Sequence, residues 1–102
     1  MTSVVGHGFQ LDTGAPGTLG VNGLLSFDTA AAALQMIQAA LAGSAMDRLD
    51  LAGVRHSDSA GLACVLAIAA DADRRGQALQ VVNIPAGMRL LAQVCEVDRL
   101  MD

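Results

Sequence analysis

The sequence predicts an α/β domain whose sheet has parallel central strands and whose helices pack on one face. Strand-like and helix-like segments alternate along the chain and are joined by short connections, as in strand–helix–strand units. The chain has 102 residues, which is close to the common size of one domain, and 53% of them are hydrophobic. Only 2% are aromatic, so Leu, Val, Ile, Ala and Met must build the core. We therefore expect a single domain over residues 1–102.

The first quarter of the chain predicts a β-hairpin. One strand is expected over residues 5–11, because side chains that would face the same side of a strand recur at every second position. These alternating residues are Val5, His7, Phe9 and Leu11. Residues 13–17 (Thr-Gly-Ala-Pro-Gly) are a dense turn signal, and Leu19 and Val21 belong to the returning strand.

A first helix is expected from Asp28, as N-cap, to about Ala42, and Gly43 would end it. Leu34, Ile37 and Leu41 recur at helical spacing and define its inner face.

A third strand is expected near residues 48–51, within a stretch that alternates polar and apolar residues. A long second helix follows and closes near residues 71–75, where charged residues gather. Its apolar positions at helical spacing are Leu62, Val65, Leu66 and Ala69, and we expect Leu62, Val65 and Leu66 to be buried against the sheet.

The C-terminal part predicts a fourth strand over residues 79–83 and a third helix whose first turn is set by Pro85. The side chains expected to pack inward from this helix are Met88, Leu90, Leu91 and Cys95. Residues 97–102 would form a short tail or an edge strand.

The most informative stretch is Ser57-Asp58-Ser59-Ala60-Gly61-Leu62, between the third strand and the second helix. It holds mostly small or polar residues, so the helix should begin at Asp58 or Ser59 with a side-chain oxygen capping its free amides. A helix start carries partial positive charge and favours a phosphate, which makes Ser59 a candidate phosphorylation site. The small residues Ala60, Gly61 and Ala63 would let another protein approach the turn closely.

This stretch resembles the signature of STAS domains, a family that includes bacterial anti-sigma-factor antagonists and the cytoplasmic domains of sulfate transporters. The family pattern is a strand, then Asp-Ser/Thr-x-Gly-Leu, then a helix, and residues 58–62 fit it. Residues 23–30 resemble its second strand and first helix, and residues 76–85 its next strand and helix start. The resemblance covers roughly residues 18–102 and implies a mixed sheet of four or five strands with helices mainly on one face. One departure is Glu96, which stands where the family often has Gly.

The resemblance also implies a function in protein binding rather than catalysis. One reading is a regulatory subunit that binds the cytoplasmic ATPase of an Mla-type phospholipid ABC transporter. The other is an anti-sigma-factor antagonist that an anti-sigma kinase switches off by phosphorylating Ser59. Both use the same surface, whose residues are Asp58, Ser59, Ala60, Gly61, Leu62 and Ala63. Three features resemble the transporter type more: the single-domain length, the form of the signature, and the Leu-x-Val-x-Asn-x-Pro run ending at Pro85.

A hydrolase is the third and least favoured alternative. His7, His56, Ser57, Asp58 and Ser59 supply the residue types of a catalytic triad. The nucleophile elbow requires Gly-x-Ser-x-Gly, however, and Ser57 occupies the position of the first Gly before Ser59. We therefore expect no catalytic residue.

The remaining sequence features predict neither a metal nor a cofactor. Cys64 and Cys95 have no CxxC partner, and we expect both to be buried structural thiols. The histidines lack neighbours at metal-ligand spacing. Residues 6–11 lack the third glycine of a dinucleotide fingerprint.

Charge and hydropathy limit the kinds of partner. The net charge is −4 and the six basic residues, all Arg, are scattered, which argues against a nucleic-acid partner. The N-terminus has no positive, apolar signal pattern, and the longest apolar run, residues 61–70, is half the length of a membrane span. We expect a cytoplasmic protein that reaches the inner membrane only through its partner.

Overall fold

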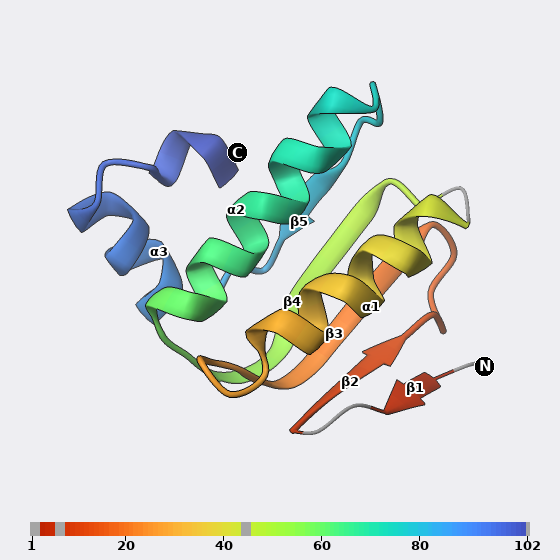
Figure 1. Ribbon diagram of the computed structural model, residues 1–102, viewed down its shortest axis with the longest axis horizontal. Helices are drawn as coiled ribbons and strands as arrows, with labels where there is room; N and C mark the ends of the chain where they lie inside the picture. Colours follow the sequence, from red (N-terminus) through yellow and green to blue (C-terminus); the bar gives the residue numbers. More distant parts are fainter. Residues whose placement is uncertain (1–2, 6–7, 44–45, 102) are drawn as a thin grey trace.

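A five-stranded mixed sheet is covered on one face by α-helices in the computed structural model, which describes residues 3–5, 8–43 and 46–101 (Figure 1). The strands lie in the sheet in the order of the sequence, β1-β2-β3-β4-β5. The elements are β1 (Ser3–Val5), β2 (Phe9–Asp12), β3 (Thr18–Leu25), α1 (Ala30–Ala42), β4 (Arg48–Ser57), α2 (Ser59–Arg74), β5 (Gln80–Val82), α3 (Ala86–Val94) and the 3-10 helix η1 (Asp98–Met101). The predicted fold class is therefore confirmed.

The N-terminal region forms two strands where the alternation predicts one. β1 and β2 pair antiparallel, and β2 in turn pairs antiparallel with β3 as the expected hairpin. Gly8, directly before β2, has a φ of 82°, in the left-handed region that does not continue a strand. The prediction of one strand over residues 5–11 was therefore wrong, and His7 lies outside the described residues.

The three C-terminal strands are parallel, and β4 is much longer than predicted. β3 pairs with β4 from Thr18 opposite Arg48 to Leu25 opposite Ser57. The carboxyl ends of β3 and β4 therefore lie side by side, and the chain enters α1 and α2 from this same edge (Figure 1). The loop between β3 and α1 and the turn between β4 and α2 meet there, with Phe27 and Asp58 31 residues apart in the sequence. This edge carries the candidate site.

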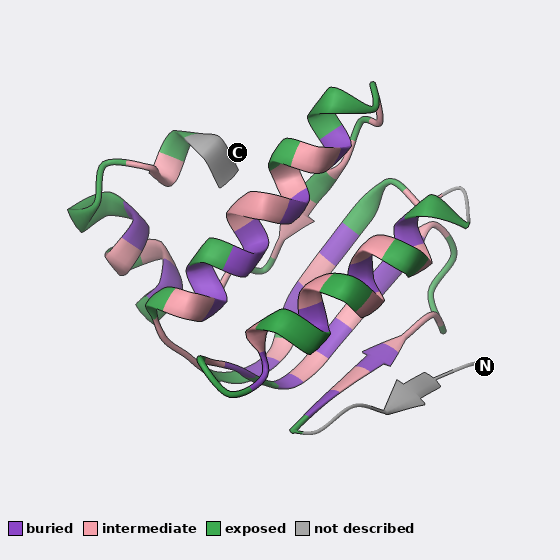
Figure 2. Cartoon of the chain, viewed as in Figure 1, coloured by how far each residue is buried: buried purple, intermediate pink, exposed green. Residues whose placement is uncertain are grey.

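Burial follows the helix–sheet interface (Figure 2). The side chains with less than 2% exposure include Leu19, Val21, Leu25, Ile37, Leu49, Leu51, Val65, Ile68 and Met88. They come from both central strands and all three α-helices, so the core is one layer between sheet and helices. Leu, Ile, Val and Met dominate it, as the composition predicts.

The start of α1 is one residue later than predicted. Asp28 is exposed, and Thr29 is the N-cap residue. The Thr29 hydroxyl is directed back into the loop, where it accepts from the Ser26 N–H at 2.9 Å and donates to the Leu24 carbonyl at 3.0 Å. Because the hydroxyl orders the preceding loop, Thr29 is buried and Asp28 is left on the surface.

The inner faces of α2 and α3 also differ in part from the prediction. Leu62 and Val65 are buried as expected, but Leu66 is only partly buried. In α3 the buried residues are Met88 and Ala92, four apart on one stripe. Leu90 lies on the opposite side of the helix and is 62% exposed, so its predicted inward packing was wrong.

The end of α3 explains why the Cys95 thiol is exposed and how the chain accommodates Glu96, where the STAS family often has Gly. Cys95 is the C-cap residue and is exposed, contrary to prediction, because it lies beyond the last packed turn. Glu96 has a φ of 59°, the left-handed conformation that Gly adopts most readily, and its N–H donates to the Gln93 carbonyl. The tail then forms η1 rather than an edge strand.

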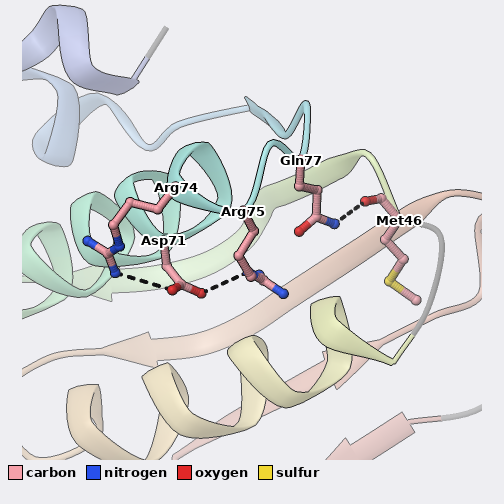
Figure 3. Close-up of polar contacts among 5 residues, drawn as sticks. All are labelled: Met46, Asp71, Arg74, Arg75 and Gln77. Carbon is pink, nitrogen blue, oxygen red and sulfur yellow. Dashed lines mark hydrogen bonds and ion pairs between the residues drawn. The ribbon is translucent and has the colours of Figure 1, made fainter.

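The charged residues of α2 lie at its C-terminal end, where Figure 3 shows their polar contacts. Asp71 pairs with Arg74 and with Arg75, each at 3.2 Å. The Gln77 side chain donates to the Met46 carbonyl at 2.9 Å and ties this end to the loop before β4. The first three turns of α2, over residues 59–70, therefore carry no charged side chain.

Candidate functional site

The signature turn connects the end of β4 to α2, and Asp58 caps the helix. Asp58 has extended backbone angles, and its Oδ1 accepts from the N–H groups of Ala60 at 2.9 Å and Gly61 at 3.1 Å. These amides have no partner within the helix, so the carboxylate satisfies them and complements the helix dipole. The helix start predicted at Asp58 or Ser59 is confirmed.

The same carboxylate joins this turn to the loop between β3 and α1. Its Oδ2 accepts from the N–H of Phe27 at 3.0 Å, and the Asp58 N–H donates to the Leu25 carbonyl at 3.3 Å. Asp58 therefore fixes the relative position of both loops at the carboxyl edge of the sheet. The sequence pattern predicts the cap, but not this bond, because Phe27 is 31 residues away.

These hydrogen bonds favour the ionised carboxylate. The Phe27 N–H makes the largest contribution to lowering the pKa of Asp58 below its ordinary value of 3.8, and the Gly61 and Ala60 N–H groups add to it. The partial removal of the carboxylate from water opposes this effect, and His56 adds a smaller favourable charge interaction. Asp58 is thus a structural anion at neutral pH.

Gly61 and Leu62 fix the helix against the sheet rather than facing outward. A Cβ at Gly61 would lie 2.1 Å from the Leu25 carbonyl oxygen, so only Gly allows this close approach of α2 to β3. Leu62 is only 4% exposed and packs in the core. Gly61 and Leu62 therefore belong to the predicted binding surface only indirectly: they hold the exposed residues of the turn in place.

The outward-facing residues of the turn are Ser59 and Ala63, with Ala60 half-buried beside them. Among the described residues, Ser59 has no hydrogen-bond partner for its hydroxyl, which is therefore open to solvent or to another protein. It lies in the first helical position of α2, next to the amides that Asp58 already occupies. The Ser59 hydroxyl is thus available for a hydrogen bond with another protein, on a turn that Asp58 caps.

A shallow apolar groove of about 360 Å³ begins at this turn and runs between α1 and α2. Its walls include Ala30, Ala31 and Leu34 of α1 and Ala60, Ala63 and Ala67 of α2. Phe27, in the loop that Asp58 holds, is 83% exposed. The sequence pattern gives no signal for Phe27, because the side chain belongs to neither a helix nor a strand.

The histidine and serines considered for a triad are not joined into one. His56 is exposed on β4, and within the described part of the chain no hydrogen bond connects it to Ser57 or Ser59. Cys64 is buried, as predicted, and removal from water raises the pKa of its thiol to about 11. Such a thiol is protonated at neutral pH and is a poor nucleophile.

Two further findings concern metals and membranes, and both are limited to residues 3–5, 8–43 and 46–101. No cluster of three or more His, Cys, Asp or Glu side chains there has the geometry to hold a metal ion. None of the helices in this part combines the length and the apolar character that crossing a membrane requires.

The fold resembles that of a solved regulatory protein. The anti-sigma factor antagonist SpoIIAA in its unphosphorylated form is similar with a TM-score of 0.68 and 18% sequence identity, over 92% of this chain and 85% of that one. At this identity the likeness concerns the fold. No curated protein sequence matches the chain.

The family assignment is carried by the sequence model described as "Mlab, STAS domain", which matches residues 10–102. The match includes most of β2, the central strands, all three α-helices and the capped turn at Asp58. Proteins of the STAS domain family are generally regulators that bind other proteins. The chain belongs to the STAS domain family.

Proposed function

We propose that this protein is a regulatory subunit that binds the cytoplasmic ATPase of an Mla-type phospholipid ABC transporter through the turn at the start of α2. The observation that carries the proposal is the exposed Ser59 hydroxyl, which has no partner in the described chain and stands on a turn fixed by Asp58. The description of the matching family supports this partner over others.

The shape and chemistry of the turn suit a lasting contact between two proteins. Ala60 and Ala63 are small, so a partner backbone can approach Ser59 closely, and the hydroxyl can then donate or accept one hydrogen bond. The apolar surround excludes water from that bond, which is the arrangement found at the centre of protein interfaces. Because Asp58 occupies the helix amides, the turn needs no rearrangement on binding.

The test is the affinity of the purified chain for the ATPase subunit of an Mla-type ABC transporter from the same cells, measured by titration calorimetry. Ser59→Asp should weaken binding at least about tenfold, since a charge buried at an interface without a partner is costly. The variant should remain folded, because an acidic residue in the first turn of a helix is favourable. Ala70→Asp adds the same charge to an exposed position about three turns further from the cap, and is expected to bind as the wild type does.

The alternative is an anti-sigma-factor antagonist, and the same hydroxyl would then accept a phosphate from an anti-sigma kinase. The two functions differ in one measurable respect: a transporter subunit binds its ATPase without phosphoryl transfer. Co-purification from cells that contain both candidate partners, followed by intact-mass measurement, separates them. Recovery with the kinase and an added phosphate on Ser59 would overturn the transporter assignment. An unchanged affinity of Ser59→Asp for the ATPase would contradict it as well.

A further inference from the structure

We infer that the groove between α1 and α2 receives an amphipathic helix of the partner, with Phe27 as an anchor at its end. This inference rests on the proposed function, because the groove shares Ala60 and Ala63 with the turn that presents Ser59. It extends the binding surface from the signature turn to the outer surface of both helices.

The walls of the groove determine what kind of segment can occupy it. They are two α-helices, whose backbone amides and carbonyls are hydrogen-bonded within each helix. An extended peptide laid there would bury its own N–H and C=O groups without partners, which is costly. A helix satisfies its backbone internally and can present side chains alone, as in other complexes in which a helix lies in a groove.

The side chains along the groove specify the buried face of that helix. α1 contains no charged residue, and α2 contains none before Asp71, so the groove is uncharged along its length. Its walls are mostly alanines, whose small side chains leave room for large ones from the partner. The fitting partner face is therefore a stripe of Leu, Ile, Met or Phe at helical spacing.

The two ends of the groove differ in charge and give the partner helix an orientation, because Asp71, beyond the far end, is already paired with Arg74 and Arg75. Asp28 is exposed just before α1 and, within the described residues, has no ion-pair or hydrogen-bond partner for its carboxylate. The Asp58 carboxylate lies at the same end but already accepts three N–H groups. A Lys or Arg near the end of the partner helix that meets Phe27 would complement Asp28.

Phe27 has the properties of an anchor residue. It is one of only two aromatic residues in the chain, and it is 83% exposed, whereas Phe9 is 3% exposed. Its backbone N–H is held by Asp58, so the ring projects from a fixed loop and little freedom of the backbone is lost on binding. Aromatic residues of this kind carry much of the binding energy in interfaces.

The experiment compares two neighbouring exposed alanines on α1. Ala31 lines the groove, whereas Ala32 is exposed and faces away from it. Ala31→Leu fills the groove and should weaken binding of the transporter ATPase at least about tenfold, and Phe27→Ala should do the same. Ala32→Leu, which adds the same side chain outside the groove, should change affinity less than about twofold. Circular dichroism confirms that each variant is folded.

Hydrogen exchange of the ATPase, with and without this chain, identifies the occupant. Protection of one helical segment with apolar residues three and four apart supports the inference, and protection of an extended segment overturns it. If Ser59→Asp weakens binding while Ala31→Leu and Phe27→Ala bind normally, the groove is not used, although the proposed function stands. If Ser59→Asp binds normally, the proposed function itself is contradicted.

Discussion

Replacing Gly61 by Ala tests how closely α2 must approach the sheet for the site to form. The added Cβ would meet the Leu25 carbonyl oxygen at 2.1 Å and the Leu25 carbonyl carbon at 2.9 Å. An ordinary contact needs at least 3.4 Å, so the start of α2 would have to move away from β3 by more than 1 Å. The obstacle is backbone in the central sheet and cannot rotate aside. The movement would also stretch the Asp58 bond to the Gly61 N–H, now 3.1 Å long.

Two opposing terms set the expected loss of stability. Ala in place of Gly within a helix is favourable by about 1 kcal/mol. Forcing an extra methyl group into a packed interior costs about 1–3 kcal/mol and sometimes more. Since the clash involves backbone and disturbs a cap that is itself worth about 1 kcal/mol, we expect a net destabilisation of about 1–3 kcal/mol. For a domain of this size that corresponds to a fall in Tm of about 4–8 °C for each kcal/mol.

The assay is urea unfolding followed by circular dichroism at 222 nm, and Gly87 supplies the control. Gly87 lies in the first turn of α3, and a Cβ built there meets nothing within 4 Å. Gly87→Ala should therefore leave stability unchanged or raise it by up to about 1 kcal/mol. If Gly61→Ala behaves as Gly87→Ala does, the close packing of α2 on β3 is not required. The affinity of Gly61→Ala for the ATPase should fall too, because Ser59 moves with the helix start.

Further expectations concern the cap, the core and the thiols. The pKa of Asp58 is depressed in the folded state, so its ionisation stabilises the fold above the ordinary value of 3.8, and this contribution is lost as the pH falls through the lower folded pKa. The stability gap between the wild type and Asp58→Asn in urea unfolding should therefore be wider at pH 7 than at pH 3, and an equal gap would exclude this role. Leu51→Ala should cost about 2–5 kcal/mol in the same assay, whereas Leu90→Ala should change stability by less than about 0.5 kcal/mol. A thiol reagent at pH 7.5 should modify the exposed Cys95 quickly and Cys64 only after denaturation, and rapid modification of both would show that Cys64 is accessible.

The errors in the sequence interpretation have a common physical origin. Helical spacing shows which residues share a face, but it does not show how wide a stripe the neighbouring elements cover. In α3 that stripe is narrow and includes Met88 and Ala92, so Leu90 remains exposed despite being apolar. At Thr29 the hydroxyl bonds to the preceding loop, and this tertiary arrangement moved the cap one residue from the expected Asp28.

What the sequence alone determines is the local chemistry: the alternation that forms β4, the carboxylate that caps α2, and the small residues around Ser59. These depend on neighbours within a few positions, so the pattern of residues is sufficient to predict them. What only the tertiary structure decides is the meeting of the two loops, where Asp58 holds Phe27 across 31 residues and Gly61 touches Leu25. The parallel register of β3 and β4 places these loops together, and register depends on how the whole core packs. The candidate binding surface is therefore the product of both, a locally encoded turn completed by a loop from another part of the chain.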